Sequence, residues 1–209
     1  MLNIAVLVSG GGTNLQALID AQANSKIPEG KIALVISSMT DAYALERARG
    51  AGIATEVLLR KEFPSQQEYD EALLSILSQN KIDLIVLAGF MTIISKNVIR
   101  HYENKIINVH PALIPAFCGE GFYGLKVHKA VIDKGVKVTG ATVHFVNEVC
   151  DGGPIILQKA VEVLADDTPE VLQRRVMEQA EWQLLPKAVA LFCQGKICVE
   201  NGKTSIRED

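Results

Sequence analysis

Asn108 and His110 are the strongest candidates for chemistry in this sequence. They close an apolar run, Lys105 to His110 (KIINVH). Because side chains alternate along a strand, Asn108 and His110 would share one face while Val109 points the other way. A histidine can exchange protons near neutral pH or stabilise an oxyanion when charged, and an asparagine amide can donate to the same oxyanion. The alternative is a hydrogen-bonded histidine at a strand end with no catalytic role.

A second group of polar residues belongs to the alternating segment from Val136 to Val146 (VKVTGATVHFV). Thr142 and His144 would lie on the same face of that strand. Asp151 opens the Asp-Gly-Gly turn that follows. Because Asp-Gly-Gly is also an ordinary turn sequence, this pattern taken alone favours a turn residue for Asp151.

A glycine-rich loop, Ser9 to Asn14 (SGGGTN), joins an apolar run directly to a helical pattern. Glycines let backbone amides approach an anion closely, and a helix N-terminus adds the positive end of its dipole. Thr13 and Asn14 can add hydrogen bonds, so the loop predicts a phosphate site. A GxGxxG dinucleotide fingerprint starting at Gly10 would need its third glycine where Leu15 stands, and no Walker lysine follows. The alternative is a tight turn without a ligand.

The cysteines show no spacing typical of a metal site or a redox motif. They are Cys118, Cys150, Cys193 and Cys198. We interpret them as free thiols in a reducing cytoplasm. A nucleophilic Cys150 is disfavoured, because the neighbouring carboxylate of Asp151 opposes the thiolate that attack requires.

These candidates need a scaffold that brings strand ends together, and the apolar pattern predicts one. Continuous apolar runs, typical of strands buried on both faces, alternate with segments of helical spacing. The predicted strands are residues 3–9, 31–37, 53–59, 82–88, 105–110, 136–146 and 154–163, with a terminal strand at 197–200. A first helix is predicted near Leu15, and four more are predicted at residues 41–49, 65–79, 127–133 and 168–190. The last of these has Thr168 as N-cap and Pro169 at its first position. The alternation predicts an α/β fold with a mostly parallel central sheet and helices on both faces.

Ligands of such sheets collect at the carboxyl ends of the strands, which is where Asn108 and His110 are expected. The proline- and glycine-rich loop 111–124 follows them and is long for a compact domain. Long ordered loops often carry function.

Length and composition predict a single globular domain over residues 1–209. The net charge of -3 and the pI near 5.8 argue against broad nucleic-acid binding, which needs a basic surface. The first residues lack the features of a signal peptide, and no apolar stretch approaches the roughly 20 residues of a membrane span. We expect a cytoplasmic protein with small-molecule partners and with neither nucleic acid nor membrane as a partner.

The motifs together resemble the family of folate-dependent phosphoribosylglycinamide formyltransferases. The matching segments occur in the family's order over nearly the whole chain. They are SGGGTNLQ (9–16), DAYALERARGA (41–51), LAGFM (87–91), INVHPALIP (107–115), ATVHFV (141–146) and DGGPIILQ (151–158). The resemblance implies a Rossmann-like three-layer formyltransferase fold, with phosphate and nucleotide bound by the N-terminal half and folate by the C-terminal half. It also implies a monomer or homodimer that formylates 5-phosphoribosylglycinamide with 10-formyltetrahydrofolate and uses no metal.

The resemblance implies roles for particular residues. The catalytic set is Asn108, His110 and Asp151, with His144 orienting Asp151 or a water unless it is only a strand histidine. The nucleotide would contact Gly11, Gly12, Thr13, Asn14 and Glu181, the last preferred over Glu178 by counting back from Pro186. The folate would contact Gln66, Met91, Thr92, Ile93, Ile94, Asn108, Ala141, Thr142, Val143 and Val146, with its pterin bound largely by the backbone from about Ala141 to Val146.

Departures from the family leave two features open. Thr92 and Gln66 stand where the family often has basic residues near the glutamate tail of the folate, and the loop 117–124 (FCGEGFYG) differs from the commoner version. The rival functions are another folate formyltransferase or a formyltetrahydrofolate hydrolase, for whose usual extra domain the chain leaves no room, and a nucleotide-binding module without catalysis. A nicotinamide-dependent oxidoreductase is disfavoured, because the third glycine of the dinucleotide fingerprint is missing.

Overall fold

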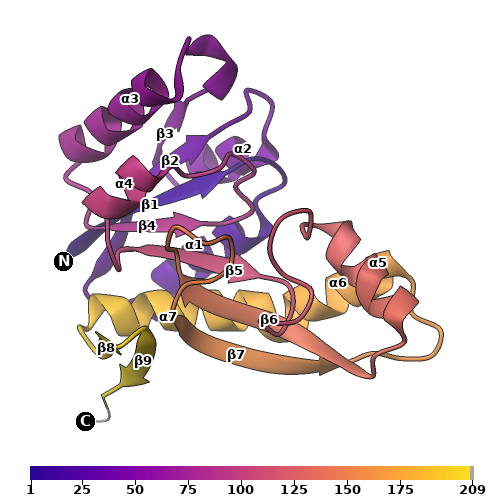
Figure 1. Ribbon diagram of the computed structural model, residues 1–209. Coiled ribbons are helices and arrows are strands. Elements are labelled where there is room, and N and C mark those ends of the chain that lie inside the picture. The colour runs from indigo at the N-terminus through magenta and orange to yellow at the C-terminus, as the bar shows by residue number, and fades with distance from the viewer. Residues whose placement is uncertain (208–209) are drawn as a thin grey trace.

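A seven-stranded sheet forms the centre of the computed structural model, which describes residues 1–207 (Figure 1). Its strand order is β3-β2-β1-β4-β5-β6-β7. The strands are β1 (Leu2–Val8), β2 (Gly30–Ser37), β3 (Ala54–Val57), β4 (Leu84–Leu87), β5 (Ile106–His110), β6 (Val138–Phe145) and β7 (Ile155–Glu162). Strands β1 to β5 pair in parallel, and β6 and β7 continue the sheet antiparallel. The prediction of a mostly parallel α/β sheet is confirmed.

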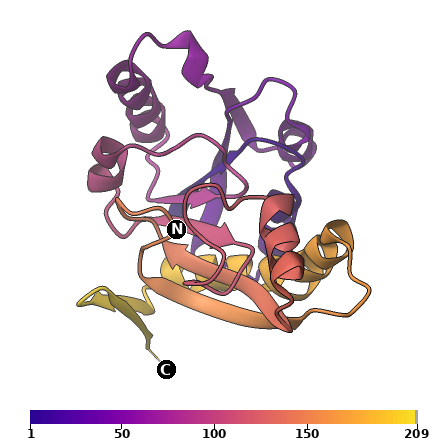
Figure 2. The same ribbon diagram turned by 45° about the vertical axis from the view of Figure 1, so that its right-hand side comes forward.

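The helices cover both faces of this sheet (Figures 1 and 2). On one face lie α1 (Thr13–Ala23), α2 (Tyr43–Gly50), α6 (Pro169–Val176) and α7 (Trp182–Cys193), and on the other lie α3 (Gln66–Gln79) and α4 (Lys96–His101). Strand β1 shows why its run is apolar throughout. Val6 and Val8 pack into the core on the side of α1 and α7, whereas Ala5 and Leu7 pack into the core on the side of α3 and α4. All four side chains are fully buried.

The long C-terminal helix is where the structure departs most from the predicted elements. The predicted helix 168–190 is a helical run in which α6 and α7 flank a π-helical turn, η2 (Met177–Glu181). Thr168 caps α6 as predicted, accepting a hydrogen bond from the Val171 amide at 3.3 Å, with Pro169 at the start. The spacing of apolar residues carried no signal for the extra residue of a π turn.

Smaller elements complete the fold. Helix α5 (Leu125–Lys134) confirms the helix predicted at 127–133, and the terminal strand predicted at 197–200 is β8 (Ile197–Glu200). Strand β9 (Lys203–Ile206), helix α4 and the short 3₁₀ turn η1 (Arg60–Glu62) were not predicted. Positions 208–209 of the predicted domain lie outside the described residues. Within the described part, no helix has both the length and the apolar character needed to cross a bilayer.

Candidate active site

The carboxyl end of β5 places Asn108 and His110 beside residues of β6. The antiparallel register sets Asn108 opposite His144 and His110 opposite Thr142. The Asn108 Nδ2 lies 3.2 Å from His144 Nε2. Thr142 holds the loop that follows β5, because its buried hydroxyl donates to the Ala112 carbonyl at 2.7 Å and accepts from the Ile114 amide at 3.1 Å.

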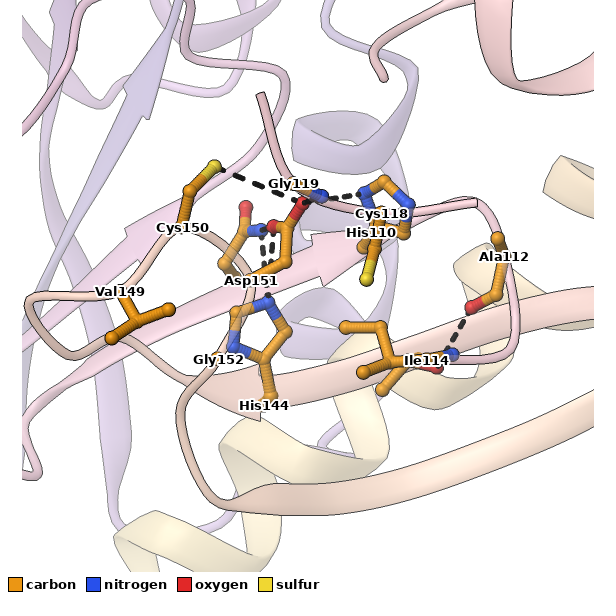
Figure 3. A network of polar contacts seen from close by, with 12 residues as sticks. His110, Ala112, Ile114, Cys118, Gly119, His144, Val149, Cys150, Asp151 and Gly152 are labelled. Carbon is orange, nitrogen blue, oxygen red and sulfur yellow. Dashed lines mark hydrogen bonds and ion pairs between the residues drawn. The ribbon is translucent and has the colours of Figure 1, made fainter. Parts of the chain in front are cut away.

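Asp151 lies between the two histidines (Figure 3). Its Oδ2 is 3.4 Å from His110 Nδ1, and its Oδ1 is 3.6 Å from His144 Nε2 and 3.5 Å from Asn108 Nδ2. The backbone of Asp151 is left-handed, with φ of 52°, so the turn aims the carboxylate inward at some conformational cost. The structure thus brings together all four residues predicted for catalysis.

The loop after β5 supplies two further contacts to this cluster. The Phe117 carbonyl accepts a hydrogen bond from His110 Nε2 at 2.8 Å, and the Gly119 amide donates to Asp151 Oδ2 at 2.9 Å. The sequence analysis predicted a function for this loop but did not single out these two contacts. Both contacts use backbone atoms, so the residue types at 117 and 119 carry no signal for them.

The protonation of the cluster follows from burial opposed by neighbours. Burial works against the Asp151 carboxylate, but the nearby His144 side chain, the hydrogen bond from the Gly119 amide and the nearby His110 side chain together outweigh it and hold the pKa of Asp151 below its ordinary value. Burial lowers the pKa of His110, and Asp151 and the Phe117 carbonyl offset part of that effect. Asp151 is therefore ionised near neutral pH.

His128 and Cys150 are neighbours that stay neutral. Burial and then the charge of His110 lower the pKa of His128 to about 4, so this fully buried imidazole is uncharged near neutral pH. Burial and then Asp151 raise the pKa of the Cys150 thiol, in the direction that disfavours a nucleophilic Cys150.

The glycine loop leads into α1 without a side-chain cap, so the first amides of the helix face outward from its N-terminus. Gly12 has φ of 71°, and a Cβ on it would lie 2.6 Å from the Cβ of Ala44. Arg47 holds the loop from α2, donating from Nε to the Gly11 carbonyl at 2.8 Å. Residue type and spacing did not predict this support by Arg47. The loop has the geometry of an anion site.

We expect Gly12→Ala to destabilise the protein by about 2 kcal/mol or more, because a left-handed backbone and a contact with Ala44 both oppose a side chain there. The same change should raise the KM of a phosphorylated substrate by moving the loop. Urea unfolding and substrate titration measure the two effects. Gly10→Ala is the matched control, since its Cβ would meet nothing within 4 Å, and equal losses in both variants would contradict the prediction.

Glu181 reaches the glycine loop from the π turn. Its carboxylate accepts a hydrogen bond from Asn14 Nδ2 at 2.7 Å and is buried, with a relative exposure of 6%. The alternative, Glu178, is exposed and bonded to Arg174 at 2.7 Å. Burial raises the pKa of Glu181 to about 7, and Asn14 opposes only part of the shift. Glu181 is thus the glutamate that joins the glycine loop.

The raised pKa of Glu181 predicts a pH-dependent loss of stability. Its folded-state value of about 7 exceeds the ordinary 4.5, so the contribution of Glu181 is complete below pH 4.5 and is lost as the pH rises through 7. From that shift, the free energy of unfolding of wild type should fall by about 3 kcal/mol over this range relative to that of Glu181→Gln, because the glutamine side chain does not ionise. Urea unfolding at pH 5 and pH 8 tests it, and parallel losses in the two proteins would contradict it.

The residues predicted to bind folate differ in their exposure and in their partners. Met91 and Ile93 are exposed apolar side chains, 56% and 85% exposed, and the Met91 amide donates to Ser9 Oγ at 2.8 Å, which joins this segment to the glycine loop. Gln66 instead accepts from Arg60 Nε at 2.9 Å and donates to Asp70 at 2.8 Å. Thr92 and Val146 are partly exposed.

Four further residues predicted to contact folate are enclosed in the structure. They are Ile94, Ala141, Thr142 and Val143. The last three lie in β6, whose backbone is paired with β5 on one side and β7 on the other, while Ile94 packs into the core beneath α3 and α4. Their side chains present almost no surface to a ligand, so a folate role for them stays a prediction.

A groove of about 660 Å³ opens beside the glycine loop between α1 and α7. Thr13, Arg47 and Trp182 line it, whereas the predicted catalytic cluster of Asn108, His110, His144 and Asp151 does not. Among residues 1–207, no group of three or more histidine, cysteine, aspartate or glutamate side chains is arranged to hold a metal ion. The chemistry of the cluster is that of proton exchange and hydrogen bonding to a developing negative charge.

Known proteins resemble this chain over most of its length, including the residues described above. The sequence matches the family model described as formyl transferase over residues 2–189. It is 41% identical over 196 residues to phosphoribosylglycinamide formyltransferase of Escherichia coli (strain K12), covering 94% of this chain and 89% of that protein. It is 43% identical over 197 residues to the Haemophilus influenzae protein of the same name, covering 94% and 90%. The solved structure of glycinamide ribonucleotide transformylase 1 from Symbiobacterium toebii superposes with a TM-score of 0.93 at 42% identity, covering 100% of this chain and 95% of that one.

Proposed function

This chain belongs to the formyl transferase family, and from that premise we propose that it transfers the formyl group of 10-formyltetrahydrofolate to the amine of 5-phosphoribosylglycinamide in purine (IMP) biosynthesis. The products are formylated ribonucleotide and tetrahydrofolate. The observation that carries the proposal is the convergence of Asn108, His110 and Asp151 at the carboxyl end of β5, the same edge of the parallel sheet from which the glycine loop follows β1.

The catalytic cluster has the groups that attack by an amine on a formyl carbon requires. As the carbon–nitrogen bond forms, negative charge develops on the formyl oxygen and the attacking nitrogen must lose a proton. Asn108 can donate to that oxygen, since its 3.5 Å contact with Asp151 is long and easily exchanged. Asp151 and His110 can accept the amine proton as a coupled pair. Breakage of the bond to the folate nitrogen, which takes up a proton, completes the transfer.

His110 gains charge where the reaction needs it. Burial disfavours the imidazolium in the free protein, but an oxyanion beside the ring favours it by opposite charge. We expect protonation of His110 to accompany formation of the oxyanion. His144 would act on Asp151, because its Nε2 faces that carboxylate and its Nδ1 is bonded to the Phe145 carbonyl at 2.8 Å.

The two substrates are assigned to neighbouring surfaces. The nucleotide phosphate would bind the amides at the start of α1, with Gly11, Gly12 and Thr13 in the loop and Asn14 and Glu181 at its side. The reduced folate would lie against Met91, Thr92, Ile93 and Val146, close to Asn108. The exposed apolar side chains of Met91 and Ile93 fit a flat aromatic ligand.

The free thiols of the described residues fit a reducing compartment, so we place the reaction in the cytoplasm. The N-terminal half of a single formyltransferase domain would supply the nucleotide loop, and the C-terminal half would supply the catalytic strand ends.

The direct test measures deformylation of 10-formyl-5,8-dideazafolate by ultraviolet absorbance with and without 5-phosphoribosylglycinamide. Turnover that requires the nucleotide, with formylated nucleotide identified by mass spectrometry, is the expected result. Turnover without it would indicate a hydrolase. Binding of both compounds without any turnover would indicate a module that lacks catalysis, and either of these outcomes would overturn the proposal.

A further inference from the structure

The two histidines beside Asp151 are held in matching ways. Each has one ring nitrogen facing the carboxylate, His110 Nδ1 at 3.4 Å and His144 Nε2 at 3.6 Å. The other nitrogen of each is 2.8 Å from a backbone carbonyl, that of Phe117 for His110 and of Phe145 for His144. A carbonyl oxygen only accepts, so each of these outer nitrogens must carry a proton.

The two carbonyls differ in what supports them. Phe145 belongs to β6 in the sheet, whereas Phe117 belongs to the loop between β5 and α5. Phe117 has φ of 51° and Gly119 has φ of 90°, so the loop holds two left-handed residues in three positions. The rings of Phe117 and Phe122 meet edge to face with centroids 6.3 Å apart, which ties the two ends of this stretch together.

We propose that residues 117–119 are a positioning segment that sets the tautomer of His110. The Phe117 carbonyl keeps a proton on Nε2, and the Gly119 amide fixes Asp151 against Nδ1. The proton that the reaction releases is then exchanged on the Nδ1 side, where the carboxylate lies. The Phe117–Phe122 contact keeps the segment in register with both groups.

Simple chemistry supports this assignment. With the proton on Nε2, a neutral His110 turns the lone pair of Nδ1 toward the Asp151 carboxylate, and two acceptors facing each other favour uptake of one proton between them. The opposite tautomer would leave the lone pair of Nε2 facing the Phe117 oxygen. The titratable groups around this pair are His144 on β6, His128 on α5, Cys118 and Glu120 on the loop, and Cys150 on the turn.

The kinetic consequence rests on the proposed function. Phe122→Ala should loosen the segment, since the ring of Phe122 packs edge to face against that of Phe117. We expect kcat for formyl transfer to fall about tenfold, the effect of one hydrogen bond to a charged group, with KM changed less than about twofold. Phe122→Tyr keeps the ring and should restore kcat. Tyr123→Ala is the matched control, because Tyr123 is 45% exposed and contacts Lys126.

The tautomer itself is measured without any substrate. The chain has 4 histidines, so nitrogen-15 labelling of histidine gives a spectrum in which every ring can be assigned by substitution. Above its pKa, His110 of wild type should show a single tautomer protonated on Nε2. In Phe122→Ala its ring should average between tautomers, while His144 stays protonated on Nδ1 as an internal control.

A second variant tests the amide donor. Gly119→Ala has open space for its Cβ but not a favourable φ, so it should pull the amide from Asp151. The acidic limb of kcat/KM should then move up by about one pH unit, because the carboxylate has lost a donor.

A wild-type His110 protonated on Nδ1, or a slowed Phe122→Ala protein whose His110 tautomer is unchanged, would overturn the proposal. A loop-dependent tautomer in a protein without formyl transfer would instead uphold the positioning role and reject only the proposed function.

Discussion

Replacement of Asp151 by asparagine is expected to lower kcat for formyl transfer by about 10³-fold, the range typical of a positioned acid–base group. The amide keeps the size of the side chain but cannot accept the proton of the attacking amine. It also removes the negative charge between His110 and His144, each less than 4.0 Å away. Initial rates at saturating concentrations of both substrates measure the effect, and KM values should change little.

Asp167→Asn separates this catalytic effect from loss of stability. Asp167 is also an enclosed carboxylate, with 2% side-chain exposure. It forms an ion pair with Arg175, with 2.6 Å between Oδ2 and Nη1, and it is not part of the catalytic cluster. Its replacement should reduce the free energy of unfolding by about 2 kcal/mol while leaving kcat unchanged. If both variants lost activity in proportion to stability, Asp151 would have no chemical role.

His110→Asn is expected to lower kcat by about 10²-fold to 10³-fold, comparable to removal of one donor to an oxyanion. The smaller side chain cannot place a protonatable nitrogen beside Asp151, so both the proton acceptor and the compensating positive charge are lost. Single-turnover kinetics with preformed ternary complex measure the chemical step. The Kd of the folate, determined by fluorescence quenching, should stay within about threefold.

The matched control for His110 is His101→Asn. His101 is exposed at the end of α4, and its Nδ1 is 2.8 Å from the Asn97 carbonyl. It should retain the wild-type rate. A His110→Asn protein that kept more than about a tenth of the wild-type rate would show that the ring does not exchange the proton or stabilise the oxyanion.

The sequence by itself determined the type of sheet, and its motifs predicted Asn108, His110, His144 and Asp151, which the structure brings together. Continuous apolar runs predicted the strands because a strand buried on both faces must be apolar at every position, as β1 is. The alternation of strands and helices then fixed a mostly parallel sheet, and parallel strands end at one edge. For that reason the Asn108 and His110 pair and the glycine loop could be placed at one site from residue type and position alone.

Only the tertiary structure decided how the site is tuned. The depressed pKa of Asp151, the raised pKa of Glu181 and the neutral His128 all depend on burial and on partners distant in sequence. The structure also assigned Thr142 to hydrogen bonds within the fold and enclosed Ala141 and Val143. The contacts of Phe117 and Gly119 were not predictable from residue type, because every residue carries the same carbonyl and, except for proline, the same amide. Which of these backbone groups reaches a side chain depends on the path of the loop through space.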